Sequence, residues 1–198
     1  MTQSRLRHAN RDDAAQLLAL IDIASRGLLI WVWSQMTAQG QSALEIGRSR
    51  IRDREDLPSH FSNWTILENS NDVIGGVAGY PIPTPYNPGD IAGLPSLYAP
   101  MLELEALAAG TWYLMALAVF PEFRRKGHAT AMLAFAERKA QEEGFARMTI
   151  MVNSSNTDAL GLYQRHGFRE IATRPYIPFP GSRDAGQWIL LEKQLQKT

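Results

Sequence analysis

The first third of the chain alternates hydrophobic and polar positions in short blocks. Residues 5–7 have the pattern of a short strand. Asp12 and Asp13 then precede residues 14–24, where Leu, Ile and Ala recur at helical spacing, and acidic side chains favour the first turn of a helix. Residues 28–36 are almost continuously apolar, and periodicity alone does not decide there between a strand and a buried helix.

Another helix and a β-hairpin follow. Residues 40–54 are expected to form a helix whose arginine-rich face is ordinarily a solvated surface. Residues 63–69 and 73–80 carry strand-forming side chains, and the Asn, Ser and Asp side chains between them favour a turn. The sequence therefore predicts two adjacent antiparallel strands.

The composition changes between Pro81 and Gly110. Six prolines in this stretch exclude a continuous helix or central strand through most of it. Residues 101–109 can still form a short helix. We interpret residues 81–110 as an insertion, which is either a functional loop or lid or an excursion without function.

The remaining residues alternate between strand and helix patterns. The run 111–120 is continuous, apolar and aromatic, as expected of a strand buried on both faces. The elements expected after it are helices at 127–143 and 156–167 and strands at 146–153, 168–177 and 186–195. The last two strands are expected to pair antiparallel. This order predicts a mixed α/β (α+β) domain.

Composition limits the classes of function. The 198 residues are 45% hydrophobic and 20% charged, which fits one soluble domain over residues 1–198 with an insertion at 81–110. Lys+Arg and Asp+Glu both total 20, so the chain lacks a global basic field for nucleic acid. There is no cysteine and the His residues lack paired spacing, so we expect no metal. The polar start and the lack of a membrane-length apolar run predict a cytoplasmic protein.

A basic turn separates the strand at 111–120 from the helix that follows it. Arg124, Arg125 and Lys126 precede Gly127. A helix that starts there directs unpaired N–H groups and a partial positive charge at a bound anion. Neither the Walker nor the Rossmann glycine pattern is present. The residues alone leave two interpretations open, a phosphate cradle and a solvated loop.

Two short motifs, in order, give a more specific signal. R-R-K-G-H-A at residues 124–129 fits [QR]-x-x-G-x-[GA], and residues 156–168 match N-x-x-A-x-x-L-Y-x-x-x-G-F. With the preceding strand L-M-A-L-A-V-F-P, they resemble the GNAT superfamily of acetyl-CoA-dependent N-acetyltransferases over roughly residues 111 to 170. The Pro-rich insertion is not a general feature of that family.

The resemblance implies a GNAT-like fold, with a mostly antiparallel central sheet flanked by helices and with splayed fourth and fifth strands that hold acetyl-CoA. It implies that backbone groups of Leu117, Ala118 and Val119 pair with the pantetheine. Asn156 would contact the pantetheine or adenosine portion. The pyrophosphate would be bound, mostly through N–H groups, by Arg124, Arg125, Lys126, Gly127, His128, Ala129 and Thr130.

The implied reaction is direct attack of an amine on the thioester, which needs a base for the amine and an acid for the departing thiolate. Tyr163 is the candidate acid, because a phenol with a pKa of about 10 stays protonated, and its alternative is a packing role. The fourth strand carries no carboxylate. The candidate base is Glu105, ranked above Glu103, and a water relayed by Thr111 or Tyr113 is another route.

The sequence leaves the acceptor open among a small amine or amino acid, a drug-like amine, and a peptide N-terminus or lysine. Aromatic side chains either line the acceptor site or lie in the core, and they are Trp31, Trp33, Tyr86, Tyr98 and Trp112. The alternative to an enzyme is a non-catalytic acyl-CoA-binding module. We expect no nucleic-acid or membrane partner, and a homodimer through an edge strand near residues 187–195 is compatible with the pattern.

Overall fold

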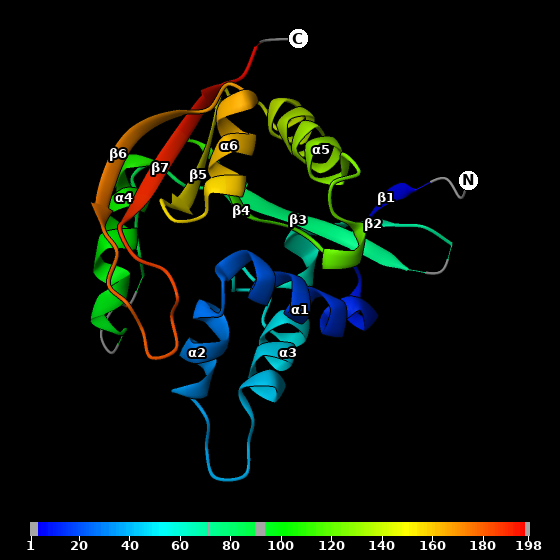
Figure 1. The fold of residues 1–198 in the computed structure, drawn as a ribbon, viewed down its shortest axis with the longest axis vertical. Helices are drawn as coiled ribbons and strands as arrows, with labels where there is room; N and C mark the ends of the chain where they lie inside the picture. The colour runs from blue at the N-terminus through cyan, green and yellow to red at the C-terminus, as the bar shows by residue number, and fades with distance from the viewer. Residues whose placement is uncertain (1–3, 71, 90–93, 197–198) are drawn as a thin grey trace. The chain divides into compact units, whose positions relative to one another are not determined.

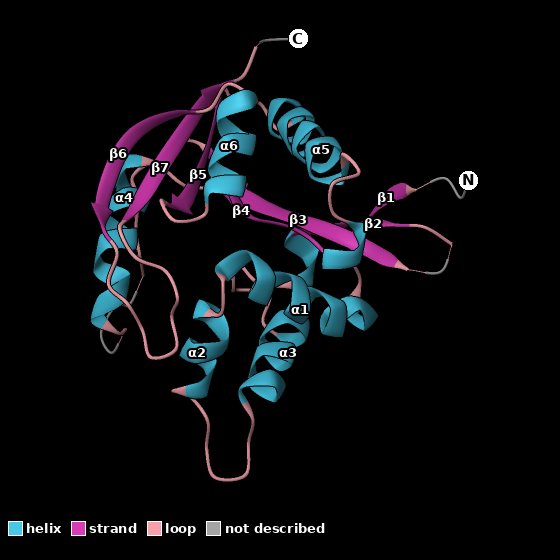
Figure 2. Cartoon of the chain, in the orientation of Figure 1, coloured by secondary structure: helices cyan, strands magenta, loops and turns pink. Residues whose placement is uncertain are grey.

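A computed structural model describes residues 4–70, 72–89 and 94–196 (Figure 1). Its strands follow the sheet order β1-β2-β3-β4-β5-β7-β6, and β4 and β5 run parallel in a mostly antiparallel sheet. Helices and strands are mixed along the chain (Figure 2), which confirms the expected mixed α/β class. The chain divides into two compact units, residues 1–79 with 115–136 and residues 80–114 with 137–198. The single-domain interpretation stays a prediction.

The first unit combines three helices with the N-terminal strands. Its elements are β1 (Arg5–His8), α1 (Ala14–Ser25), α2 (Leu28–Ser34), α3 (Ala43–Asp53), β2 (Trp64–Glu68), most of β3 (Val73–Pro81), the end of β4 (Trp112–Val119) and the start of α5 (His128–Glu142). The apolar run at 28–36 forms the helix α2, and its Trp33 side chain is buried in the core. A Cβ on Gly47 would lie 2.3 Å from the Trp33 ring, so α3 packs directly on that ring.

The predicted hairpin is present, since β2 pairs antiparallel with β3. In the same unit β3 comes very close to the end of β4. A Cβ on Gly75 would lie 2.4 Å from the Ala118 carbonyl oxygen, and the Phe120 N–H donates to the Ile74 carbonyl. Gly75 therefore permits a backbone approach that a side chain would block.

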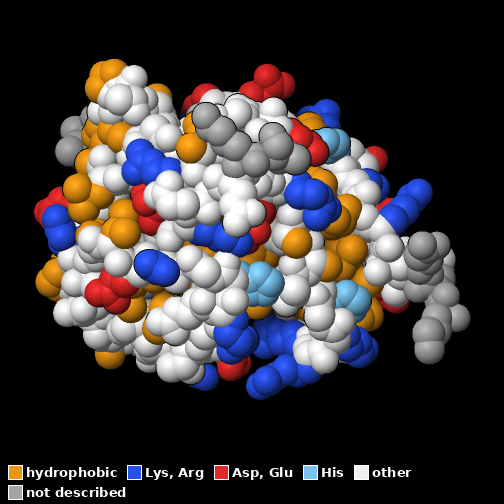
Figure 3. Space-filling view, turned by 90° about the horizontal axis from the view of Figure 1, so that it is seen from above, with side chains coloured by type: hydrophobic (Ala, Val, Ile, Leu, Met, Phe, Trp, Pro, Cys, Tyr) orange, Lys and Arg blue, Asp and Glu red, His pale blue; other side chains and the backbone are white. Residues whose placement is uncertain are grey.

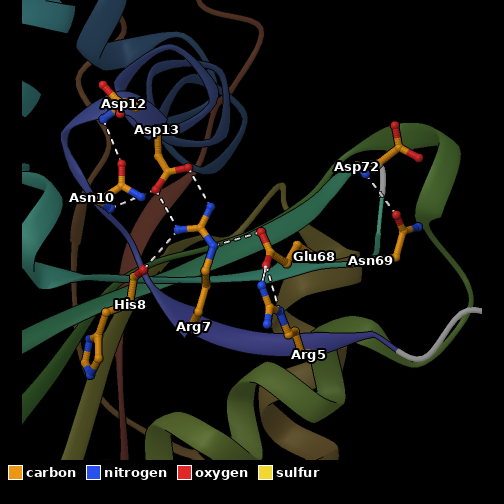
Figure 4. Close-up of polar contacts among 9 residues, drawn as sticks. All are labelled: Arg5, Arg7, His8, Asn10, Asp12, Asp13, Glu68, Asn69 and Asp72. Atoms are coloured by element: carbon orange, nitrogen blue, oxygen red, sulfur yellow. Dashed lines mark hydrogen bonds and ion pairs between the residues drawn. The ribbon is translucent and has the colours of Figure 1, made fainter.

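Arg7 ties β1 to the start of α1 (Figure 4). Its guanidinium donates to both oxygens of the Asp13 carboxylate at 2.8 Å and to Glu68 on β2 at 2.8 Å. Asp13 also accepts the Asn10 N–H, which closes a capping box around the turn Arg11–Asp13. The two acidic residues predicted to start the helix thus differ. The Asp13 carboxylate accepts these hydrogen bonds, and Asp12 is exposed.

The second unit contains the remaining strands and two helices. Its elements are the end of β3, α4 (Ala99–Leu107), the start of β4, the end of α5, β5 (Arg147–Asn153), α6 (Thr157–Arg165), β6 (Arg169–Pro175) and β7 (Gln187–Gln194). The predicted antiparallel pairing of the last two strands is confirmed. Because β7 also pairs with β5, the expectation of an edge strand near residues 187–195 is wrong. A strand bonded on both sides offers no free backbone edge to a second copy.

The insertion at 81–110 closes at its base. The Ile82 N–H donates to the Thr111 carbonyl, and the Gly110 N–H donates to the Ile82 carbonyl, both at 2.9 Å. Its second half forms α4, which packs against β6 and β7. Residues 90–93 of this stretch lie outside the described residues. The helix expected at 101–109 therefore exists, two residues earlier, as a packed element.

Charged side chains of both signs are spread over the surface. Figure 3 shows Lys and Arg at several separate places on one face, with Asp and Glu among them. Over the described ranges, no single helix is long and apolar enough to cross a membrane, and one bent pair, Arg11–Ser25 with Leu28–Ser34 at 112°, meets the requirement by length and composition only. The same residues contain no group of three or more His, Asp or Glu side chains placed to hold a metal ion.

Candidate active site

The basic turn presents open backbone at the start of α5. Gly127 has φ +81°, and no atom lies within 4 Å of the position that a Cβ would take. The first turn of α5 contains no acidic side chain. Its N–H groups lack intrahelical acceptors and carry the positive end of the helix dipole. The turn is therefore shaped to admit an anion close to the backbone.

Two of the three cations in the turn stabilise the turn itself. Arg124 Nε donates to the Val119 carbonyl at 3.1 Å. Lys126 Nζ donates to the Glu122 carbonyl at 3.3 Å and lies 5.6 Å from the centre of the Phe123 ring. The Val119 carbonyl, expected to face the cofactor, thus already accepts one hydrogen bond.

Tyr163 lies in α6 and is buried, with 4% of its surface exposed. Its ring contacts Phe168 edge to face at 5.8 Å between centroids, so Tyr163 has the packing role that was the alternative to an acid. Burial raises the pKa of its hydroxyl well above the ordinary value for tyrosine. Among the described residues no hydrogen bond engages this hydroxyl. Asn156 caps the same helix, its Oδ1 accepting the Ala159 N–H at 3.4 Å.

The two candidate bases on α4 have different surroundings. Glu105 is half-buried, and its Oε2 accepts a hydrogen bond from the Tyr86 hydroxyl at 2.7 Å. Burial raises the pKa of the Glu105 carboxyl, and the Tyr86 hydrogen bond lowers it in part. Glu103 is exposed and forms an ion pair with Arg174 on β6. The structure therefore favours Glu105 as the carboxylate available for chemistry.

Tyrosines surround Glu105. Tyr80 on β3 and Tyr113 on β4 meet edge to face at 5.6 Å between centroids. Burial raises the pKa of both hydroxyls, and the nearby Glu105 charge raises them further. Tyr113 also interacts electrostatically with Tyr163, which links the candidate acid to this cluster. The sequence analysis did not select Tyr80. A signal was present, since Tyr80 and Tyr113 flank the insertion and its two ends belong to neighbouring strands.

Other candidates from the sequence have structural partners. The buried Thr111 hydroxyl donates to the Ala108 carbonyl at 2.7 Å and lies 2.6 Å from the Thr149 hydroxyl, so it is not available to relay a water. Trp112 Nε1 donates to Glu143 at 2.8 Å, and Trp33 belongs to the core of the first unit. Trp31 and Tyr98 are half-buried. Of the five aromatic residues, Tyr86 is the one bonded to Glu105.

Solved acetyltransferases share this fold. A PaiA N-acetyltransferase from Thermoplasma acidophilum, solved in complex with coenzyme A, superimposes with a TM-score of 0.59 at 14% identity, covering 97% of this chain and 99% of that one. The ribosomal-protein-S18-alanine N-acetyltransferase of Escherichia coli gives 0.60 at 16% identity, covering 99% of this chain and 96% of that one. The chain thus has the same fold as these solved proteins.

The family model described as the acetyltransferase (GNAT) family matches residues 28–168. The chain belongs to this family, and it is an acyltransferase. An acetyltransferase of Agrobacterium fabrum is 28% identical over 131 residues, which cover 66% of this chain and 72% of that protein.

Proposed function

We propose that this protein is an acetyl-CoA-dependent N-acetyltransferase whose amine acceptor attacks the thioester directly. The observation that carries the proposal is that Glu105 and Tyr163 belong to one compact unit and both interact electrostatically with Tyr113. One side chain is a carboxylate whose pKa is raised by burial, and the other is a phenol that burial keeps protonated. A base and an acid with separated pKa values suit amine deprotonation and thiolate protonation.

The residues of the first unit fit acetyl-CoA as the co-substrate. The open space over Gly127 and the first N–H groups of α5, from His128 to Thr130, suit a pyrophosphate. Arg125, which is exposed, adds a cation beside them. Support also comes from the PaiA relative, which was solved with coenzyme A. Pantetheine contacts by Leu117, Ala118, Val119 and Asn156 stay predictions that rest on the resemblance.

The proposed chemistry divides between two side chains. Glu105 accepts the proton that the amine nitrogen loses as it bonds to the acetyl carbon. The bond between that carbon and sulfur breaks, and the Tyr163 hydroxyl donates its proton to the departing sulfur. The products are an amide and free CoA, and the proton on Glu105 returns to Tyr163 through solvent. No enzyme nucleophile is required, in keeping with a chain that lacks cysteine.

The proposed acceptor is a primary amine. One relative is the [ribosomal protein bS18]-alanine N-acetyltransferase of Haemophilus ducreyi, 39% identical over 70 residues that cover 34% of this chain and 48% of that protein. A peptide with N-terminal alanine therefore belongs in the acceptor panel, beside a lysine-containing peptide, small alkylamines and free amino acids. A cytoplasmic location and a homodimer stay predictions.

The cofactor assignment is tested by acetyl-CoA titration with thermal unfolding as the readout. Wild-type protein should gain about 2.7 kcal/mol at a ligand concentration one hundred times Kd. Gly127→Glu places an anion and a bulky side chain in the cradle and should lose most of this gain. Gly144→Glu is the matched control, because Gly144 has φ +86° and equally open space but follows the end of α5. Equal stabilisation of all three proteins would remove the cradle assignment.

The enzymatic proposal is tested by CoA release with the acceptor panel. Transfer to at least one primary amine, with mass spectrometry showing the acetylated nitrogen, is the expected result. Tight binding of acetyl-CoA without transfer to any amine in the panel would refute it.

A further inference from the structure

The insertion contributes a side chain to the carboxylate that the proposed function uses as its base. Tyr86 lies in the Pro-rich half of the insertion, 19 positions before Glu105, and its hydroxyl donates to Glu105 Oε2 at 2.7 Å. Elsewhere among the described residues the carboxylate has no hydrogen-bond partner, which leaves Oε1 to accept a proton. The contact thus holds one oxygen and leaves the other for chemistry.

Two opposed effects act on Glu105. Burial disfavours the charged carboxylate and makes it a stronger base. The Tyr86 hydroxyl stabilises the charged form and so limits that effect. Burial, with the adjacent Glu105 charge, raises the pKa of Tyr86 itself, so Tyr86 remains a donor at every pH at which the enzyme would work. The Tyr86 hydrogen bond therefore favours the ionised form of a carboxyl that burial alone would shift toward the neutral form.

Among the described residues, no cation acts on Glu105 in place of Tyr86. Tyr80 from β3 and Tyr113 from β4 face the carboxylate and are neutral phenols. On the strands that pack against α4, the Arg174 guanidinium on β6 is bonded to Glu103. On β7, Glu192 is paired with Arg147. In this surrounding the one direct hydrogen bond to Glu105 comes from the insertion.

Resting on the proposed function, we propose that Tyr86 is a positioning residue that orients Glu105 and holds it ionised for proton abstraction from the acceptor amine. The insertion is on this view part of the acceptor half of the active site. Residues 81–89 of the insertion, which include Tyr86, are then functional and not an excursion.

The first test measures Glu105 directly and needs no turnover. The carboxyl carbon of Glu105 is followed by 13C NMR during a pH titration, and Glu105→Gln assigns the signal. In Tyr86→Phe the midpoint should rise by about one pH unit, because the carboxylate loses its donor while the ring and its packing remain. Asn87→Ala is the matched control, since Asn87 caps the adjacent turn at Gly89 and its loss perturbs the same segment without removing the donor. An unchanged midpoint in Tyr86→Phe overturns the proposal.

The second test is the pH dependence of kcat/KM with an acceptor found in the panel. In Tyr86→Phe the acidic limb should move to higher pH, giving about a tenfold loss one unit below the wild-type limb and a smaller loss on the plateau. A uniform loss at every pH would show a merely structural role and overturn the proposal. Wild-type protein that acetylates no amine refutes the proposed function, whereas the NMR titration still decides the Tyr86 contact independently.

Discussion

At the scale of single residues, Tyr163 has a packing role and is also the candidate general acid. Its ring is held against Phe168, and its hydroxyl has no partner among the described residues. Burial raises the pKa of this phenol, so it stays protonated and can donate to a leaving thiolate. The two roles can be separated by removing only the oxygen.

We therefore predict that Tyr163→Phe lowers kcat by about 10² to 10⁴-fold, the usual contribution of a general acid. The acetyl-CoA dissociation constant, measured by calorimetry, should change little because the ring remains. Tyr176→Phe serves as the control, since this tyrosine is also buried and the change also removes only a hydroxyl, one that contacts Ser182 and has no proposed chemical role. Full activity in Tyr163→Phe would show that the leaving thiolate takes its proton elsewhere.

The sequence selects candidate residues more sharply inside the motifs than outside them. Gly127 and Tyr163 follow from short patterns with fixed spacing. Glu105 could only be ranked beside Glu103, because two positions apart on a helix means nearly opposite faces, and the sequence does not say which face is covered. In the structure they differ in burial and in the Tyr86 contact, and both depend on how residues 81–89 lie against α4.

At the scale of elements, the bond from Arg7 to Asp13 joins β1 to the turn before α1 (Figure 4). Burial raises the pKa of Asp13, but the hydrogen bonds from Arg7 and from the Asn10 N–H outweigh it, so the net pKa lies below the ordinary value. A carboxylate with a lowered folded pKa stabilises the protein above its unfolded pKa of about 3.9. That contribution is lost as the pH falls through the folded pKa.

Asp13→Asn should accordingly reduce the free energy of unfolding at pH 7 by about 2 kcal/mol, the scale of hydrogen bonds to a charged group. The difference from wild type, measured by urea denaturation, should shrink as the pH is lowered below about 4. Asp12→Asn, one position away on an exposed side chain, should have little effect at either pH. A difference that does not depend on pH would mean that packing and not charge is lost.

Element type was predictable where the pattern was long, and position in the sheet was not. The helix α5 and the strands β4 and β5 lie within a residue or two of their predicted bounds. The apolar run at 28–36 stayed ambiguous because burial around Trp33 removes the polar face that marks a helix. The position of β7 between β5 and β6 depends on its pairing with β5, a long-range contact that the local sequence pattern does not encode.

At the scale of the whole molecule, charges balance locally as well as in total. Formal net charge is zero, and the arginine-rich end of α3 is paired, with Arg52 Nη2 3.0 Å from Asp53 and Arg54 Nη2 2.6 Å from Asp56. Figure 3 shows both signs on the face that it draws. The electrostatic footprint of a nucleic-acid-binding protein is a basic stripe that releases many counterions.

We therefore predict no measurable binding of duplex DNA at an ionic strength of about 0.15 M. Fluorescence anisotropy with a labelled duplex of random sequence is the measurement, repeated at low salt to reveal any weak electrostatic association. Affinity that persists at this salt and declines steeply with more would show that the basic turn and α3 act together on DNA.

The hydrogen bonds that join the two ends of the insertion have a consequence for how the acceptor specificity of such an enzyme can change. Because Ile82 is hydrogen bonded to both Gly110 and Thr111, the segment between them leaves and re-enters the sheet at one place. The entropy of closing a loop grows only slowly with its length, so the length of the segment can vary at small entropic cost where a replacement restores the packing of α4 on β6 and β7. A graft from a relative between Ile82 and Gly110 would replace Tyr86, Glu105 and α4 together, so the candidate base and its hydrogen-bond donor would be exchanged as one segment while the strands and the basic turn stay in place.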